Sequence, residues 1–218
     1  MPNLTLTYFT FRGLGEPIRL MLEDLGVPYE DKRVGGAEWD ALKPHMQFRQ
    51  VPRLQDGPRT LFQCQAILRY LARPRGLCGE TEDERVRNDI SAEAARDVQQ
   101  RLWDHFWSPG SDGAEASEAF EKGTLSDQLQ LIADWLGRAP YFGGERPLFG
   151  DYYALTVLDE AAAFFPRAFE RMPALTRYRT RMYARPRLAA YVASGRQSNG
   201  YGFDPIRGVR MPTSSATT

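Results

Sequence analysis

The start of the chain combines strand-like and helix-like patterns of apolar residues. Leu4, Leu6 and Tyr8 alternate with polar side chains, which is the period of a strand with one buried face. A helical pattern occupies residues 17–25, and a second strand is expected over residues 29–34. This order predicts a βαβ unit.

The pattern continues with a short helix and a hairpin. A weakly helical stretch lies around residues 39–43. Two short strands follow within residues 53–62, and the Asp56-Gly57 pair between them is typical of a hairpin turn. Because a helix follows directly, we expect the order βαβ, α, ββα in a first domain over residues 1–80.

The pattern changes after a polar stretch at residues 79–85, which we interpret as a linker. Beyond it, apolar residues recur at helical spacing over residues 86–107, 116–136, 152–165 and 175–182. The sequence therefore predicts an α+β protein, with an all-helical second domain over residues 85–207. The small and polar residues 208–218 are expected to form a disordered tail.

Charge and cysteine content exclude several classes of function. The chain has 28 basic and 28 acidic residues, so no net field would attract nucleic acid or an anionic membrane. No apolar run is long enough to span a bilayer, and a cytoplasmic protein is expected. The two cysteines and two histidines have no metal-ligand spacing, which predicts free thiols and no metal site.

Two cofactor or redox functions are disfavoured by missing residues. Gly13 and Gly15 match the start of a dinucleotide-binding fingerprint, but Ile18 stands at the third glycine position. A thiol–disulfide exchange site would need a cysteine soon after the first strand, and the first cysteine is Cys64.

Two candidate binding positions lie in the first predicted elements. Tyr8 ends the first strand and faces the start of a helix, where anions and small ligands bind, although its ring could simply cap a core. Trp39 and Lys43 are four residues apart and can offer an indole N–H and a cation to a carboxylate. By themselves, these two side chains are equally typical of a solvent-exposed helix.

Two further candidates flank the predicted hairpin. If the peptide bond before Pro52 is cis, the backbone N–H and C=O of Val51 face outward and can pair with an extended peptide. An ordinary loop proline is the alternative. Gln63 and Cys64 lie where the hairpin ends and a helix begins, so their backbone amides suit a carboxylate or form a simple helix cap.

Taken together, these motifs resemble the cytosolic glutathione transferases, in particular the tyrosine-dependent group of mu, pi and sigma classes. The resemblance extends from residue 1 to about residue 205. The motifs that carry it are Tyr8-Phe9-x-x-Arg12-Gly13, Trp39-x-x-x-Lys43, Gln50-Val51-Pro52, Gln63-Cys64-x-Ala66-Ile67-x-Arg69-Tyr70-Leu71 and Gly79-Glu80-Thr81-Glu82-x-Glu84-Arg85.

The resemblance implies a thioredoxin-like first domain that binds glutathione as co-substrate and a helical domain that adds an electrophile pocket. Tyr8 would be the catalytic residue, donating its hydroxyl to the glutathione sulfur. The implied glutathione-binding residues are Trp39, Lys43, Gln50, Val51, Pro52, Gln63, Cys64 and, across a dimer interface, Asp97. The implied electrophile pocket consists of Phe9, Leu14, Trp103, Asp104, Trp107, Tyr201 and Phe203.

The implied function is conjugation of glutathione to hydrophobic electrophiles, typical of detoxification, by a homodimer in which Phe48 inserts into the partner. A glutathione-dependent isomerase or a specialised C–S bond-forming enzyme is the alternative, followed by a non-catalytic binding or structural protein. The chain departs from the family at three positions. Cys64 replaces a serine, Leu14 replaces an arginine of sigma and pi members, and Leu148 replaces a helix-capping Ser or Thr, a loss of about 1 kcal/mol.

Overall fold

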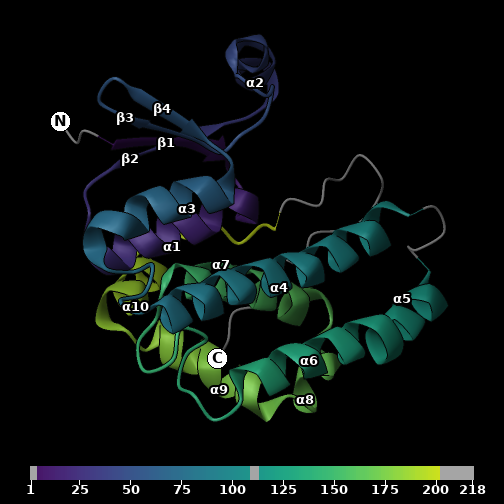
Figure 1. The fold of residues 1–218 in the computed structure, drawn as a ribbon. Coiled ribbons are helices and arrows are strands. Elements are labelled where there is room, and N and C mark those ends of the chain that lie inside the picture. Colours follow the sequence, from purple (N-terminus) through teal and green to yellow (C-terminus); the bar gives the residue numbers. More distant parts are fainter. Residues whose placement is uncertain (1–3, 109–112, 202–218) are drawn as a thin grey trace.

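The fold is built from a small mixed sheet stacked on a larger group of helices (Figure 1). The computed structural model describes residues 4–108 and 113–201 of the 218-residue chain. The predicted tail at residues 208–218 lies outside the described residues. The domain ranges 1–80 and 85–207 stay predictions, while the change from mixed to all-helical structure falls between the third and fourth α-helices.

The sheet has four strands in the order β2-β1-β3-β4. The strands are β1 (Leu4–Phe9), β2 (Glu30–Val34), β3 (Arg53–Asp56) and β4 (Arg59–Phe62). β1 pairs in parallel with β2 and antiparallel with β3, and β3 and β4 form the predicted hairpin. Leu6 and Leu54 lie opposite each other in this register and are both 0% exposed, so the centre of the sheet is anchored in the core.

The helices of the first half are α1 (Glu16–Leu25), α2 (Gly36–Leu42) and α3 (Cys64–Ala72). α1 and α3 lie between the sheet and the other helices, whereas α2 projects from the far side of the sheet (Figure 1). Gly26, in the left-handed conformation (φ 63°), ends α1 where the sequence pattern ends. The predicted order βαβ, α, ββα is confirmed.

In the described part of the second half, the regular elements are all helices, and an isolated β-bridge joins Tyr141 to Gly144. Its helices are α4 (Glu82–Trp107), α5 (Ala114–Phe120), α6 (Ser126–Leu136), α7 (Phe149–Phe164), α8 (Pro166–Glu170), α9 (Pro173–Tyr183) and α10 (Pro186–Ala193). The single helix expected over residues 116–136 is interrupted by a π-helical turn at Glu121–Leu125. Glu121 is buried there and accepts hydrogen bonds from Arg167 and from the backbone N–H of Ala168, a distant contact that periodicity does not reveal.

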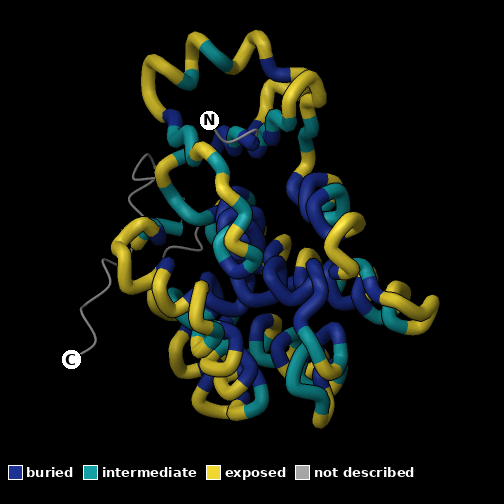
Figure 2. Tube along the Cα trace, turned by 90° about the vertical axis from the view of Figure 1, so that its left-hand side faces the viewer, coloured by how far each residue is buried: buried dark blue, intermediate teal, exposed yellow. Residues whose placement is uncertain are grey.

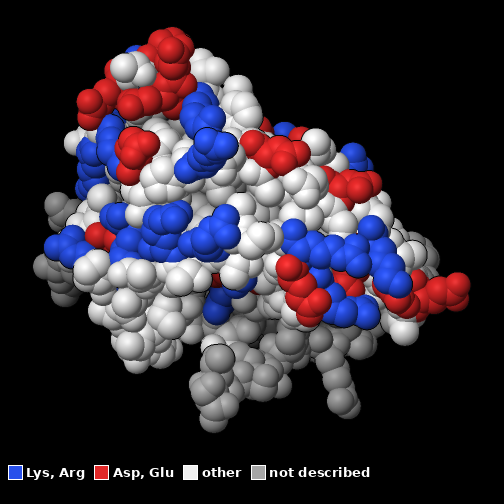
Figure 3. Space-filling view, turned by 90° about the horizontal axis from the view of Figure 1, so that it is seen from below, with Lys and Arg blue, Asp and Glu red and all other residues white. Residues whose placement is uncertain are grey.

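Arginines of the last three helices link the surface to buried acids. Residues 166–193 contain seven arginines and one glutamate, and three of the arginines reach inward: Arg167 to Glu121, Arg179 to Asp159 and Arg185 to Asp24. Seen from below, the molecule carries Lys and Arg beside Asp and Glu (Figure 3). These helices are therefore fastened to the core by ion pairs as well as by apolar contact.

The core runs through α7, which packs against α1, α3, α4, α8 and α9. Every residue from 149 to 161 is buried, and dark blue, buried segments are concentrated in the middle of the molecule (Figure 2). Tyr152 on this helix donates a hydrogen bond to Asp24 of α1 (2.7 Å), which joins the two halves of the chain. Of the helices in the described ranges, none has the length and apolar character needed to cross a membrane.

The start of α7 is held by a buried carboxylate. Asp151 accepts hydrogen bonds from the backbone N–H groups of Phe142, Gly143 and Leu148 at 2.8, 3.0 and 2.9 Å. The N–H of Asp151 donates to the carbonyl oxygen of Leu148 (3.1 Å). This backbone hydrogen bond partly replaces the one that a capping hydroxyl at residue 148 would accept from the same N–H.

Replacing Asp151 with alanine should lower the free energy of unfolding by about 3 kcal/mol or more, because three buried N–H groups lose their acceptor. The measurement is equilibrium unfolding in urea. Asp40→Ala, on the exposed face of α2, is the matched control and should change the same quantity by less than about 0.5 kcal/mol. Equal effects of the two substitutions would contradict this account of Asp151.

Candidate functional site

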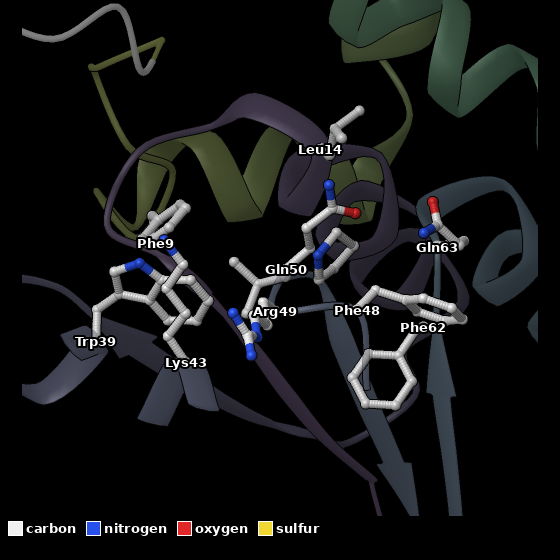
Figure 4. A pocket seen from close by; sticks show the side chains of 11 residues that line it. Phe9, Leu14, Trp39, Lys43, Phe48, Arg49, Gln50, Phe62 and Gln63 are labelled. Atoms are coloured by element: carbon white, nitrogen blue, oxygen red, sulfur yellow. The ribbon is translucent and has the colours of Figure 1, made fainter. Parts of the chain in front are cut away.

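A cavity of ≈ 300 Å³ lies beside the end of β1 and the start of α3. It is lined by Phe9, Leu14, Trp39, Lys43, Phe48, Arg49, Gln50, Val51, Pro52, Phe62 and Gln63. Trp39, Phe9 and Lys43 gather at one end, Phe62 and Gln63 lie at the other, and Gln50 lies between them (Figure 4). The structure thus brings together most of the side chains that the sequence singled out for glutathione.

Tyr8 is not among the residues that line this cavity. It is 5% exposed and belongs to a buried cluster with Val51, against which the lining residues Phe9 and Leu14 pack. Its hydroxyl oxygen accepts a hydrogen bond from the backbone N–H of Leu14 (2.8 Å). Burial raises the pKa of the phenol well above its ordinary value, although the Leu14 bond opposes this effect. The hydroxyl therefore keeps its proton at neutral pH and has it available to donate.

The tyrosine is fixed by two glycines in the turn between β1 and α1. A Cβ atom added to Gly13 would lie 2.4 Å from the Tyr8 hydroxyl oxygen, and one added to Gly15 would lie 2.4 Å from a carbon of its ring. Gly13 also has a φ of +36°, which favours glycine. The Gly13-Leu14-Gly15 sequence is thus explained by close packing on Tyr8 rather than by a nucleotide.

The lining of the cavity carries cations but no acid. Trp39 packs edge-on against Phe9, with ring centroids 5.2 Å apart, and Lys43 follows one turn later. Arg49, with a φ of 52°, also lines the cavity. Within the described ranges, neither Lys43 nor Arg49 forms an ion pair, so both cations remain available to an anionic ligand.

The start of α3 forms another part of the cavity. Gln63 precedes the helix and has a φ of 70°, a backbone conformation that is uncommon for residues other than glycine. Gln63 is exposed to solvent. Cys64 begins the helix but is 5% exposed, and burial raises the pKa of its thiol, which stays neutral. The cysteine side chain therefore lies in the core, and Gln63 is the residue that lines the cavity.

The loop before β3 contributes buried residues and one exposed aromatic residue to the lining of the cavity. The Val51–Pro52 peptide bond is cis, and both residues are buried while lining the cavity. Phe48 is 54% exposed and packs edge-on against Phe62, with ring centroids 5.8 Å apart. Asp97 lies apart from this cavity, exposed on α4.

The residues expected to bind an electrophile are less closely grouped. Phe9 and Leu14 line the cavity. On α4, the Trp103 indole N–H donates to Glu160 (3.1 Å), Asp104 accepts from a neighbouring glutamine (2.7 Å), and Trp107 is 48% exposed.

Tyr201 and Phe203 complete the expected electrophile pocket. Tyr201 lines a second cavity, of ≈ 470 Å³, where Arg12 donates a hydrogen bond to its hydroxyl oxygen (2.8 Å). Phe203 lies outside the described residues.

Sequence reasoning missed two lining residues and a buried acid. Arg49 and Phe62 have no motif of their own, although each is adjacent in sequence to a residue that was singled out. Glu160 is the partner of Trp103 and gives no local signal, because it lies within a helical pattern. Among the described residues, no group of three or more metal-ligating side chains could hold a metal ion.

Substituting Gly15 with alanine should force the Tyr8 ring to move and lower the free energy of unfolding by about 1–3 kcal/mol. Urea unfolding measures this change. Gly123→Ala is the control, because nothing lies within 4 Å of an added Cβ there. If Gly15→Ala were as stable as the control variant, the close contact with Tyr8 would not hold in solution.

Comparisons with known proteins show the family of the chain. The glutathione S-transferase N-terminal domain model matches residues 4–73, and the C-terminal domain model matches residues 96–195. The chain is 37% identical over 203 residues to glutathione S-transferase Mu 1 of Oryctolagus cuniculus, covering 88% of this chain and 92% of that protein. It is 36% identical over 203 residues to glutathione S-transferase Mu 6 of Mus musculus, with the same coverage.

Solved structures give the same result. The pi-class glutathione S-transferase of Onchocerca volvulus superposes with a TM-score of 0.81 at 30% identity, covering 88% of this chain and 93% of that chain. A rat hPGDS structure complexed with a quinoline superposes with a TM-score of 0.80 at 27% identity, covering 88% and 97%. The chain therefore belongs to the glutathione S-transferase family, and the protein is a glutathione transferase.

Proposed function

We propose that this glutathione transferase activates the thiol of glutathione through the Tyr8 hydroxyl and transfers the thiolate to a hydrophobic electrophile. The observation that carries the proposal is the arrangement at Tyr8. Its oxygen accepts a hydrogen bond from the Leu14 N–H while its proton remains available to donate, and the residues packed on Tyr8 line a cavity that also contains the cations Lys43 and Arg49. Such a donor stabilises a sulfur anion more than a neutral thiol.

The stabilisation of the glutathione thiolate that this role requires is modest. A free thiol with a pKa of about 8.5 is a few per cent ionised at neutral pH, and lowering that pKa by about two units corresponds to roughly 2.7 kcal/mol. One preorganised hydroxyl donor can supply much of this free energy. The raised pKa of Tyr8 is consistent with the role, because a phenol that ionised first could not donate.

The carboxylates of glutathione fit the two ends of the cavity. We assign the γ-glutamyl carboxylate to Gln63 and the backbone N–H groups that begin α3, and the glycyl carboxylate to the end with Trp39 and Lys43. Gln50 and the backbone of Val51 lie between these ends, where the cysteinyl residue would bind. The Cys64 thiol is buried and contributes no hydrogen bond to the ligand in this assignment.

The electrophile would bind beside Phe9 and Leu14, the expected electrophile residues that line the cavity. These apolar walls suit flat or apolar molecules. Leu14 places no cation beside the expected sulfur position, which favours conjugation over the glutathione-dependent isomerase alternative. A screen of aryl halides, epoxides and unsaturated ketones distinguishes the two functions.

We also propose that the enzyme is a homodimer. Phe48 is 54% exposed, and burying such a ring in a partner would contribute roughly 1.5–3 kcal/mol. Asp97, exposed on α4, would then approach the γ-glutamyl amine in the partner's site.

Replacing Tyr8 with phenylalanine should reduce kcat/KM by about 30- to 1000-fold, or roughly 2–4 kcal/mol, because the donor to the thiolate is lost. The thiolate absorbance of the glutathione complex near neutral pH should disappear as well. Tyr29→Phe, which removes another partly buried hydroxyl that donates to Glu23, is the control and should keep near wild-type activity. Wild-type turnover and an unchanged thiol titration in Tyr8→Phe would refute the assignment.

Phe48→Ala should shift the protein toward a monomer in sedimentation at low micromolar concentration, since the interface loses its aromatic anchor. Leu131→Ala is the matched control, because Leu131 is an exposed apolar side chain on α6 (62% exposed) without a proposed interface role. A Phe48→Ala protein that sediments as a dimer would rule out this residue as the anchor.

A further inference from the structure

The turn that donates a hydrogen bond to Tyr8 begins at Arg12, immediately before the 3₁₀ turn Gly13–Gly15. Two of the residues at positions 12–15 are glycines and Leu14 is apolar, so Arg12 has the polar side chain of this turn. Glycine gives the backbone more conformational freedom than other residues do. A turn of this composition therefore needs an anchor if the Leu14 N–H is to stay on the Tyr8 oxygen.

The Arg12 side chain forms several contacts with distant parts of the chain. Its Nε donates to the backbone carbonyl oxygen of Ser198 (2.7 Å), and one terminal nitrogen donates to the hydroxyl oxygen of Tyr201 (2.8 Å). The same nitrogen lies 3.5 Å from a carboxylate oxygen of Asp159. The guanidinium carbon also lies 4.6 Å from the centre of the Tyr201 ring. Because the side chain is only 14% exposed, water competes little for these contacts.

The Arg12 backbone binds the same C-terminal segment, residues 196–201, which we call the strap. The Arg12 N–H donates to the carbonyl oxygen of Gly200 (2.8 Å), and its carbonyl oxygen accepts from the N–H of Glu16 at the start of α1 (2.9 Å). The strap, at the yellow end of the described chain, therefore runs beside the start of α1 (Figure 1). Arg12 joins it to the turn through both backbone and side chain.

The strap is also fastened at positions away from the turn. Arg196 forms an ion pair with Glu23 of α1 (2.6 Å), and the Gln197 amide donates to Glu16 (3.0 Å). These bonds hold the strap on the first half of the chain independently of Arg12. The strap is thus a fixed element to which Arg12 can anchor a flexible turn.

The turn transmits the position of Arg12 to Tyr8. Leu14, two residues after Arg12, donates its N–H to the Tyr8 oxygen (2.8 Å). Gly13 leaves no spare room, because a Cβ atom there would lie 2.4 Å from the same oxygen. Displacing the turn by about 1 Å would break the Leu14 bond or push Gly13 against the hydroxyl, and a misplacement of that size can slow a reaction about 10²-fold.

We propose that Arg12 is a positioning residue of the transferase reaction, which holds the turn against the strap and thereby orients the Tyr8 hydroxyl toward the glutathione sulfur. The inference rests on the proposed function of Tyr8. Arg12 is not among the residues that line the ≈ 300 Å³ cavity, so it acts through the turn rather than on the substrate. An arginine suits this position because its planar fork donates in several directions at once, whereas a lysine ammonium is a point charge on a flexible stem.

A double-mutant cycle of Arg12→Lys with Tyr8→Phe tests the proposal. Lysine keeps a positive charge beside the buried Asp159 but loses the fork that holds the strap. Arg12→Lys should lower kcat/KM about tenfold when Tyr8 is present. In the Tyr8→Phe background it should lower kcat/KM less than about twofold, because the hydroxyl that Arg12 positions is already gone. A purely structural role would give the same factor in both backgrounds.

The thiolate absorbance of the glutathione complex near neutral pH, measured without electrophile, gives a second readout. It should fall by about half in Arg12→Lys, because a thiol loses ionisation steeply when its pKa rises past the measuring pH. Tyr201→Phe removes one acceptor of the Arg12 guanidinium and should cause a smaller fall. Arg196→Gln is the matched control, since it cuts the ion pair with Glu23 but leaves the contacts of Arg12, and should keep the wild-type absorbance.

Two results would overturn the role of Arg12 while Tyr8→Phe is impaired, and both leave the proposed function intact. One is an equal loss of kcat/KM in the two backgrounds, and the other is a wild-type thiolate absorbance in both Arg12→Lys and Tyr201→Phe. If Arg12→Lys does not fold, the absorbance of Tyr201→Phe decides the question. If Tyr8→Phe has wild-type turnover, the proposed function fails, and the role of Arg12 fails with it.

Discussion

A helix buried on every side must satisfy each of its polar groups within the protein, and α7 places this constraint on the whole molecule. Its hydroxyls and carboxylates all find partners on other elements or on its own backbone. Tyr152 binds Asp24 of α1, Tyr153 binds Gln99 of α4, and Asp159 pairs with an arginine of α9. The Tyr152–Asp24 bond fixes the sheet half of the chain against the helical half, and the other two bonds hold α7 against its neighbours within the helical half.

The cavity itself lies within the sheet half of the chain. All of its lining residues fall between Phe9 and Gln63, and α4 contributes none of them. Tyr8 packs against the turn that leads into α1, and α1 in turn contacts α7. A shift of α7 would therefore act on the surroundings of Tyr8 through α1.

The sequence predicts the parts of the fold that depend on local patterns. The strand that ends one residue after Tyr8, the hairpin turn after Asp56 and the end of α1 before Gly26 are encoded by residues next to one another in the chain. The π-helical turn was not predicted, because it depends on Glu121 meeting Arg167 across 46 positions. Short helices that begin at a proline, such as α8, also have too few residues to show a period.

The site residues also differ in whether local sequence or tertiary packing determines their position. Motif residues such as Trp39, Gln50 and Gln63 line one cavity, since each lies in a loop or helix start anchored to the sheet. Tyr201 instead lines a second cavity, because Arg12, far away in sequence, bonds to its hydroxyl. Partners of this kind follow from tertiary packing, which no single segment encodes.

The distribution of charge around the cavity favours the binding of an anion. Next to the lining residues, burial keeps the Tyr8 phenol and the Cys64 thiol neutral at pH 7. At the edge of the cavity, the solvent-exposed Lys43 and Arg49 remain charged. An anion that enters therefore meets cations at the rim and no competing negative charge within. Charges interact more strongly inside a buried wall than at a solvent-exposed rim. Ionisation of one buried group beside the cavity would therefore destabilise the bound anion more than removal of a cation at the rim.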